Sequence, residues 1–100
     1  MARSLGIQSE LPENLTLALG TAEVSPLELT NAYATVAALG VQAQPVFIRK
    51  VIGRHDEVLF EVEPETTIAL PPAVSYVLTS MMRSVIEEGT AKAAMVLERP

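Results

Sequence analysis

Cysteine and tryptophan are absent from this 100-residue sequence, which has only four aromatic residues and one histidine. Without cysteine, the chain has no disulfide bonds, no thiolate metal site and no cysteine nucleophile. Because large aromatic side chains are scarce, the core is expected to be aliphatic and to consist mainly of alanine, leucine and valine. These absences exclude a disulfide scaffold and a thiolate zinc module.

Cationic residues are also few, with 7 Lys and Arg against 12 Asp and Glu and a formal net charge of −5. Apart from Arg49 and Lys50 they are scattered singly, so no basic stripe is available for nucleic acid or for an anionic membrane surface. The longest apolar run, residues 32–41, has half of the roughly 20 residues that a transmembrane helix needs. Residues 1–4 lead into no apolar stretch of the kind that a signal peptide has.

The remaining composition is that of a folding chain. Hydrophobic residues make up 49% of it and charged residues 19%, which excludes disorder by composition. The length fits one small domain or part of a larger one. We predict an α+β fold with two long helices, one β-hairpin and short flanking helical pieces.

The first long helix is predicted over residues 26–39. Ser25 is the expected N-cap, Pro26 occupies the first helical position, and Glu28 is placed to complete a capping box. Gly40 is the expected stop. The face expected to be buried repeats at intervals of three and four residues and consists of Leu29, Ala32, Tyr33, Val36, Ala37 and Gly40.

The second long helix is predicted over residues 72–88, with Pro72 at its first position and Gly89 after its end. Its expected apolar stripe consists of Val74, Val77, Leu78, Met81, Met82 and Val85. Its expected polar side consists of Ser75, Thr79, Arg83 and Glu87. Thr90 is the expected cap of a last short helix over residues 91–97.

A β-hairpin is predicted over residues 45–63, where β-branched and aromatic residues flank a turn at residues 53–57. Because a two-stranded hairpin is marginal alone, its apolar face is expected to rest on a helix. Arg49 and Lys50 are placed to pair across the strands with Glu61 or Glu63. The proline-bounded residues 64–71 are expected to be a linker.

The first quarter of the chain gives weaker signals. Residues 1–11 are expected to be a frayed terminus or the end of a preceding helix, with Gly6 in a left-handed conformation. Residues 12–24 contain Leu15, Leu17 and Leu19 at period two. This alternation predicts a short extended piece that ends at Gly20, with Asn14 and Thr16 facing water.

No residue pattern indicates a catalytic, cofactor or metal site. His55 is the single histidine and lies beside Asp56 and Glu57 in the predicted turn, which is too few ligands for a metal centre. Glu87 and Glu88 are adjacent on a helix and point about 100° apart, so they do not form an acid–base pair. We therefore assign no catalytic, cofactor-binding or metal-binding residue and expect no cofactor.

The order of several motifs resembles the transpeptidase domain of bifunctional (class A) penicillin-binding proteins. The most specific block is A-L-G-T-A-E-V-S-P-L-E-L at residues 18–29, and A-Y-A follows at residues 32–34. Collinear matches are L-G-I at 5–7, P-V-F-I-R-K-V at 45–51, T-S-M-M at 79–82 and E-E-G-T-A at 87–91. The chain departs from the family at His55, Asp56 and Glu57, where an Asp-Gly turn is usual, and at Ala91, where many relatives have glycine.

The resemblance implies a serine-transpeptidase/β-lactamase-like domain whose parent cross-links peptidoglycan stem peptides through an acyl-serine that β-lactams also form. That chemistry uses S-x-x-K, S-x-N and K-[ST]-G motifs, and none of the three occurs here. No serine is followed three residues later by lysine; Ser80 comes nearest, with Arg83. Residues 1–100 are thus expected to be a partial transpeptidase domain, the segment between S-x-N and K-[ST]-G without either motif, and Met1 an added start residue.

The resemblance further implies a parent anchored in the bacterial inner membrane, with this segment in the periplasm. The expected partner is the rest of the parent domain, and peptidoglycan and β-lactams are reached only through the parent. The stripe of the second helix is expected to fold onto the hairpin and first helix or to drive self-association. The alternative is a free-standing binding or scaffold module without enzymatic activity.

Overall fold

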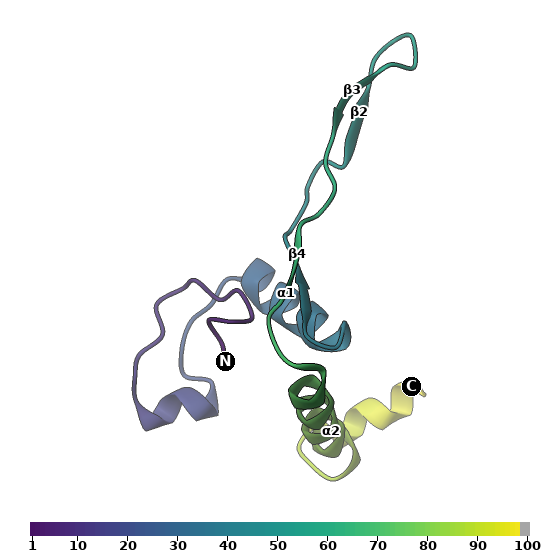
Figure 1. Ribbon diagram of the computed structural model, residues 1–100. Coiled ribbons are helices and arrows are strands. Elements are labelled where there is room, and N and C mark those ends of the chain that lie inside the picture. The colour runs from purple at the N-terminus through teal and green to yellow at the C-terminus, as the bar shows by residue number, and fades with distance from the viewer. Residues whose placement is uncertain (99–100) are drawn as a thin grey trace.

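A computed structural model describes residues 1–98 and has the α+β composition expected from the sequence. Figure 1 shows the helices gathered at one end of the molecule, with a long two-stranded hairpin reaching away from them. The elements in chain order are η1 (Leu15–Leu19), α1 (Pro26–Ala37), β1 (Val41–Ala43), β2 (Lys50–Ile52), β3 (Val58–Glu61), β4 (Thr66–Ile68), α2 (Pro72–Glu87) and η2 (Lys92–Leu97), where η marks a 3₁₀ helix. None of these helices is long and apolar enough to span a membrane.

Helix α1 begins as predicted, because Ser25 and Glu28 form the complete capping box with Pro26 at the first helical position. It ends two residues earlier than predicted, at Ala37. The expected buried face is only partly buried: Ala32, Val36 and Gly40 are covered. The prediction is wrong for the three remaining members of that face, Leu29, Tyr33 and Ala37, which are exposed.

The end of α1 is a left-handed turn that leads directly into a sheet absent from the sequence prediction. Leu39 has a φ of 56° and Gly40 a φ of 92°. Strand β1 then pairs antiparallel with β4, and Val41 lies opposite Ile68. Residues 64–71 are therefore not a simple linker, because they contain β4. Each of these strands has only three residues, too few to show a reliable alternating pattern.

The predicted hairpin is present as β2 and β3 but is shorter than predicted, because residues 45–49 are not in a strand. Lys50 lies opposite Glu61 and Val51 opposite Phe60. Its turn lies at residues 53–57, where the Gly53 amide donates to the Glu57 carbonyl at 2.8 Å. The expected helical support is wrong, because every residue of both strands is exposed and neither strand packs on a helix among residues 1–98. Within these residues, neither Arg49 nor Lys50 forms an ion pair with Glu61 or with Glu63.

Helix α2 spans Pro72–Glu87, close to the predicted limits, and Leu78 and Met82 pack against the core. Ser75 was expected on the polar side but is fully buried, since it lies against the end of α1. Gly89 follows the C-cap Glu88 without a positive φ. The 3₁₀ helix η2 corresponds to the predicted last helix, but its N-cap is Ala91 rather than Thr90.

The N-terminal segment contributes to the core instead of fraying. Leu5 and Ile7 are each 9% exposed and form the buried cluster with Ala32, Val36 and Leu70. Gly6 has the expected positive φ, 89°.

The extended piece predicted from the alternating leucines is wrong, because residues 15–19 form η1. Leu15 and Leu19 are 96% and 83% exposed, so no covered face holds the segment in an extended form. Asn14 and Thr16 do face solvent as expected. Figure 1 shows η1 carried outward from the other helices on a wide loop.

The molecule is far more open than an isolated domain of its size. Its radius of gyration is 17.5 Å, against about 13 Å for a compact domain of 100 residues. Its accessible surface is 8407 Å², against about 5,500 Å² for a compact monomer. The structure therefore leaves an unusually large part of its apolar surface uncovered.

We expect Gly40→Ala to destabilise the chain much more than Gly20→Ala. Both glycines have a positive φ, 92° and 75°, so both substitutions incur a left-handed strain of about 1–2 kcal/mol. A Cβ at Gly40 also collides with the Leu70 carbonyl oxygen and lies 2.8 Å from Ser75 Oγ, whereas a Cβ at Gly20 meets nothing within 4 Å. Overpacking adds about 1–3 kcal/mol. Thermal unfolding followed by circular dichroism measures the difference. Equal losses of stability in the two variants would show that the close contact of Gly40 with Leu70 and Ser75 is unimportant.

Candidate functional site

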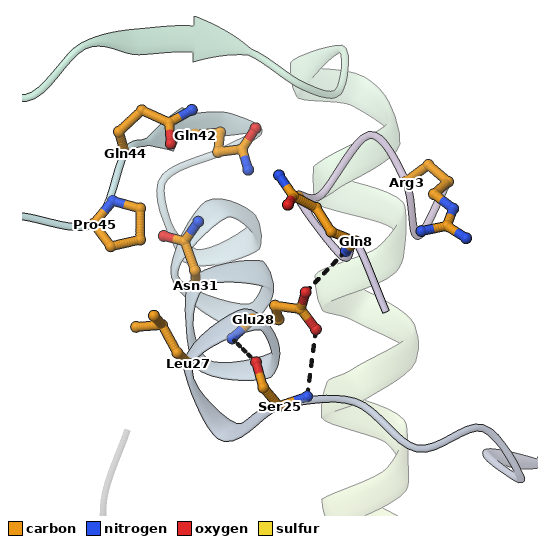
Figure 2. A pocket seen from close by; sticks show the side chains of 10 residues that line it. Arg3, Gln8, Ser25, Leu27, Glu28, Asn31, Gln42, Gln44 and Pro45 are labelled. Atoms are coloured by element: carbon orange, nitrogen blue, oxygen red, sulfur yellow. Dashed lines mark hydrogen bonds between the residues drawn. The ribbon is translucent and has the colours of Figure 1, made fainter. Parts of the chain in front are cut away.

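A polar hollow lies between the N-terminal segment, the start of α1 and strand β1. It has a volume of about 490 Å³, and Figure 2 shows the side chains around it. Its polar lining consists of Arg3, Gln8, Ser25, Glu28, Asn31, Gln42 and Gln44. Four of these seven side chains are carboxamides, so the lining is dominated by neutral hydrogen-bonding groups.

Glu28 ties the N-terminal segment to α1. One carboxylate oxygen, Oε1, accepts from the amides of Gln8 at 3.0 Å and Ser9 at 3.2 Å. The other, Oε2, accepts from the Ser9 hydroxyl at 2.5 Å and from the Ser25 amide at 3.3 Å. Figure 2 shows the carboxylate between the Gln8 and Ser25 amides. A single side chain therefore completes the cap of α1 and holds a segment 19–20 residues earlier in the chain.

These hydrogen bonds lower the pKa of the Glu28 carboxyl group from its ordinary value. The hydroxyl of Ser9 is the largest cause; desolvation comes next and opposes it, and the amides of Gln8, Ser25 and Ser9 each lower the pKa further. Hydrogen bonds to the charged form favour that form. Glu28 is therefore an ionised structural group and is poorly suited to act as a general base near neutral pH.

The hollow has no activated nucleophile. Ser25 Oγ accepts a hydrogen bond from the Glu28 amide at 3.2 Å as the helix cap, and neither lysine nor histidine is among the lining residues. Arg3 donates to the Ile7 carbonyl at 3.0 Å, and an arginine stays protonated in proteins. The arrangement can hydrogen-bond a neutral polar group but cannot activate a hydroxyl for attack.

Sequence reasoning identified Ser25 and Glu28 as caps but missed the carboxamides around them. Gln42 and Gln44 stand two residues apart, and residues at this spacing share one face of an extended chain. That signal becomes usable only once residues 41–43 are known to form a strand. Gln8 and Asn31 come from two other segments, and no local pattern links them.

The titratable groups considered from the sequence are not brought together. His55 is exposed in the hairpin turn, and its backbone amide donates to Glu57 Oε2 at 2.8 Å. Figure 1 shows this turn at the far end of the hairpin from the helices. Within residues 1–98, no three His, Asp or Glu side chains gather closely enough to hold a metal ion.

The serines near the second helix are likewise separated from a base. Arg83, the residue three after Ser80, pairs through Nε with Glu87 Oε1 at 2.6 Å, and this contact raises its pKa. Ser75 is fully buried, and its hydroxyl has no hydrogen-bond partner in the described part of the chain. Glu88 is exposed at the C-cap of α2.

We expect Glu28→Gln to lower the thermal midpoint at neutral pH. We also expect the midpoint of this variant to fall less when the pH is lowered. Because the folded pKa lies below the ordinary 4.5, the carboxylate contributes its full stability above that value, and the contribution is lost as the pH falls through the lowered pKa. Glu23→Gln is the control, since the Glu23 carboxylate makes no hydrogen bond within residues 1–98. Circular dichroism melts between about pH 3 and pH 7 cover this window. An unchanged acid dependence in Glu28→Gln would contradict the role assigned to Glu28.

No protein-family model matches the chain, but it is similar to several curated proteins. It is 48% identical over 84 residues to penicillin-binding protein 1A of Aquifex aeolicus (strain VF5), an alignment that covers 84% of this chain and 12% of that protein. It is 32% identical over 96 residues to penicillin-binding protein 1A of Neisseria cinerea, covering 91% of this chain and 12% of the relative.

A third relative, penicillin-binding protein 1A of Pseudomonas aeruginosa, is 26% identical over 142 residues, which cover 92% of this chain and 17% of that protein. The chain thus spans about one eighth of the length of the first two relatives and about one sixth of the length of the third. Similarity extends over nearly all of the chain in each case. The chain therefore corresponds to a segment of the class A penicillin-binding proteins, the family that its motifs resemble.

Proposed function

We propose that the chain is a non-catalytic structural segment of a peptidoglycan D,D-transpeptidase. In this proposal its parent cross-links stem peptides in the cell wall through an acyl-serine, and residues 1–100 lie between the S-x-N and K-[ST]-G motifs of a serine-transpeptidase-like domain. The motif order and the similarity to penicillin-binding protein 1A support this assignment. The sequence contains none of the three motifs that carry the chemistry.

The observation that carries the proposal is the amount of exposed apolar surface. The accessible surface exceeds that of a compact monomer by about 2,900 Å². Within residues 1–98, five hydrophobic residues form the buried cluster. A segment whose remaining partners lie in the rest of a larger domain accounts for such exposure, because its apolar faces are covered by other parts of that domain.

The segment has the parts that a supporting role needs. Helix α1 is firmly capped and packs against the N-terminal segment, and α2 presents an apolar face over most of its length. In the parent, these faces would pack within the helical lobe and behind the central sheet. The partner of the segment is then the rest of the transpeptidase domain, in the periplasm of a bacterium whose inner membrane anchors the parent.

The polar hollow favours a second candidate, a free-standing binding module. Its four carboxamides present both donors and acceptors and would suit a neutral polar ligand. The two proposals differ in what they require of the isolated chain. A binding module unfolds in one sharp cooperative transition, whereas a segment lacking its domain partners is expected to unfold in a broader, less cooperative transition that still has a measurable midpoint. Differential scanning calorimetry of the 100-residue chain separates them.

We expect no covalent adduct when the chain is incubated with a large excess of benzylpenicillin. Acylation needs a serine beside a proton acceptor and donors around the developing oxyanion. Ser25 does not meet this requirement because its hydroxyl is the helix cap, and Ser75 does not because its side chain is fully buried. Intact-mass spectrometry measures the outcome, with the Aquifex aeolicus penicillin-binding protein 1A as positive control. A stoichiometric adduct on one serine of this chain would overturn the non-catalytic assignment.

A further inference from the structure

Most of the carboxamide side chains of this chain gather in one place. The sequence has three glutamines and two asparagines. Four of these five side chains line the polar hollow of about 490 Å³ beside the start of α1, namely Gln8, Asn31, Gln42 and Gln44. They come from the N-terminal segment, from α1, and from β1 with the residue that follows it. The fifth, Asn14, precedes η1 and lies outside the hollow.

Two of the four side chains bring their amide nitrogens to one point in the hollow. A Cβ at Gly6 would collide with Gln42 Nε2, and the same position lies 3.7 Å from Asn31 Nδ2. Because Gly6 has no side chain, both nitrogens can approach it. Asn31 and Gln42 are half-buried and form the inner pair, whereas Gln8 and Gln44 are exposed and form the outer pair.

The hydrogen-bonding capacity of these four side chains is unused within residues 1–98. The Gln8 amide that binds Glu28 and the Asn31 carbonyl that binds Thr35 both belong to the backbone. Figure 2 shows hydrogen bonds among the residues drawn only around Glu28. Each carboxamide offers two N–H donors and a carbonyl acceptor. An apolar surface that closed over them would leave these groups without partners, which is costly, so the hollow suits a polar occupant.

The charges of the hollow favour an uncharged ligand. Its two charged side chains, Arg3 and Glu28, have opposite signs. The Glu28 carboxylate already accepts four hydrogen bonds, about as many as its two oxygens can accept. Arg3 donates to the Ile7 carbonyl. The groups that remain free are neutral, and each both donates and accepts. An amide group matches them because its N–H donates and its carbonyl oxygen accepts.

The walls of the hollow are fixed by contacts that need no ligand. Glu28 holds the segment around Gln8 against the capped start of α1. Strand β1 is held by β4, with Gln42 opposite Thr67. A preformed site spends less of its binding free energy on ordering its side chains and loops. The volume also falls within the roughly 300–1,000 Å³ that is typical of small-ligand sites.

We infer that the hollow is a binding site for a neutral ligand that carries amide groups, such as a peptide backbone. A carbonyl oxygen of the ligand accepts hydrogen bonds from the inner pair, Asn31 and Gln42, and an N–H of the ligand donates to the outer pair, Gln8 and Gln44. Every one of these groups belongs to this chain. The site therefore does not depend on whether the chain is a segment of a larger domain, and failure of either proposal leaves the other standing.

An NMR titration of the chain with N-acetylglycine N-methylamide, an uncharged molecule with two amide groups, tests the site. The side-chain NH₂ signals of asparagine and glutamine are observed directly, so each carboxamide reports on itself. We expect the signals of the inner and outer pairs to shift and to saturate in roughly the millimolar range, as is usual for so small a ligand. The Asn14 signal is the internal control and is expected to stay in place. Unmoved signals in the hollow, or an equal shift at Asn14, overturn the inference.

A pair of variants tests the inner amides. Gln42→Leu removes one of them, and we expect the diamide to bind about tenfold more weakly because its carbonyl oxygen loses a donor. Asn14→Leu is the matched control, since it removes a carboxamide outside the hollow, and it is expected to keep the native affinity. Circular dichroism checks that both variants keep the native helix content. Equal affinities in the two variants overturn the role of the inner pair.

Two further ligands test the chemistry that the hollow selects. Acetate is similar in size to a single amide group but is charged, and we expect it to leave the signals of the hollow unmoved. Acetamide has one amide group, and we expect it to bind at least about fivefold more weakly than the diamide because it cannot engage both pairs at once. Binding of acetate as tight as that of the diamide overturns the preference for a neutral ligand. Equal affinity for acetamide and the diamide overturns a peptide backbone as the source of the amide groups.

Discussion

The close approach of the Gly40 backbone to Leu70 and Ser75 is the contact on which the other elements depend. The Gly40 amide donates to the Thr35 carbonyl at 2.8 Å and so ends α1. The Gly40 carbonyl accepts from Ala69 at 2.8 Å and Leu70 at 3.2 Å and so joins β1 to the segment after β4. Ser75 lies against the same glycine at the start of α2. One residue without a side chain therefore links both helices to the β1–β4 sheet.

Beyond this junction the chain has few internal contacts to define its shape. The buried cluster contains five hydrophobic residues, and the β2–β3 hairpin is exposed on both faces. Antiparallel pairing maintains the hairpin, but two strands alone are only marginally stable in water. In the proposed parent domain, the exposed side of α2 and the exposed hairpin would each be covered by residues outside this segment. The proposed function would therefore account both for the openness of the molecule and for its similarity to a short part of long relatives.

The sequence predicts best what depends on neighbouring residues. The capping box of Ser25 and Glu28, the proline starts of both helices and the hairpin turn are all local, and all are present. The sequence prediction misses the features that depend on contacts between residues far apart in the chain. Strands β1 and β4 are too short to show a pattern. Leu5 and Ile7 are buried because they cluster with residues of α1 and with Leu70, all distant in the sequence. Ser75 follows the polar pattern of its helix, yet its small side chain fits against Gly40 where a larger one would not.

The same distinction explains why the most specific motif in the chain concerns folding rather than catalysis. The S-P-L-E sequence at residues 25–28 contributes strongly to the family resemblance, and its role at the helix start follows from local rules. Its second role does not, because Glu28 also binds the amides of Gln8 and Ser9. A neutral side chain at this position would weaken the four hydrogen bonds that the carboxylate accepts, three of which come from Gln8 and Ser9. The motif therefore identifies how this segment is assembled, and in the proposed function the chemistry depends on motifs outside it.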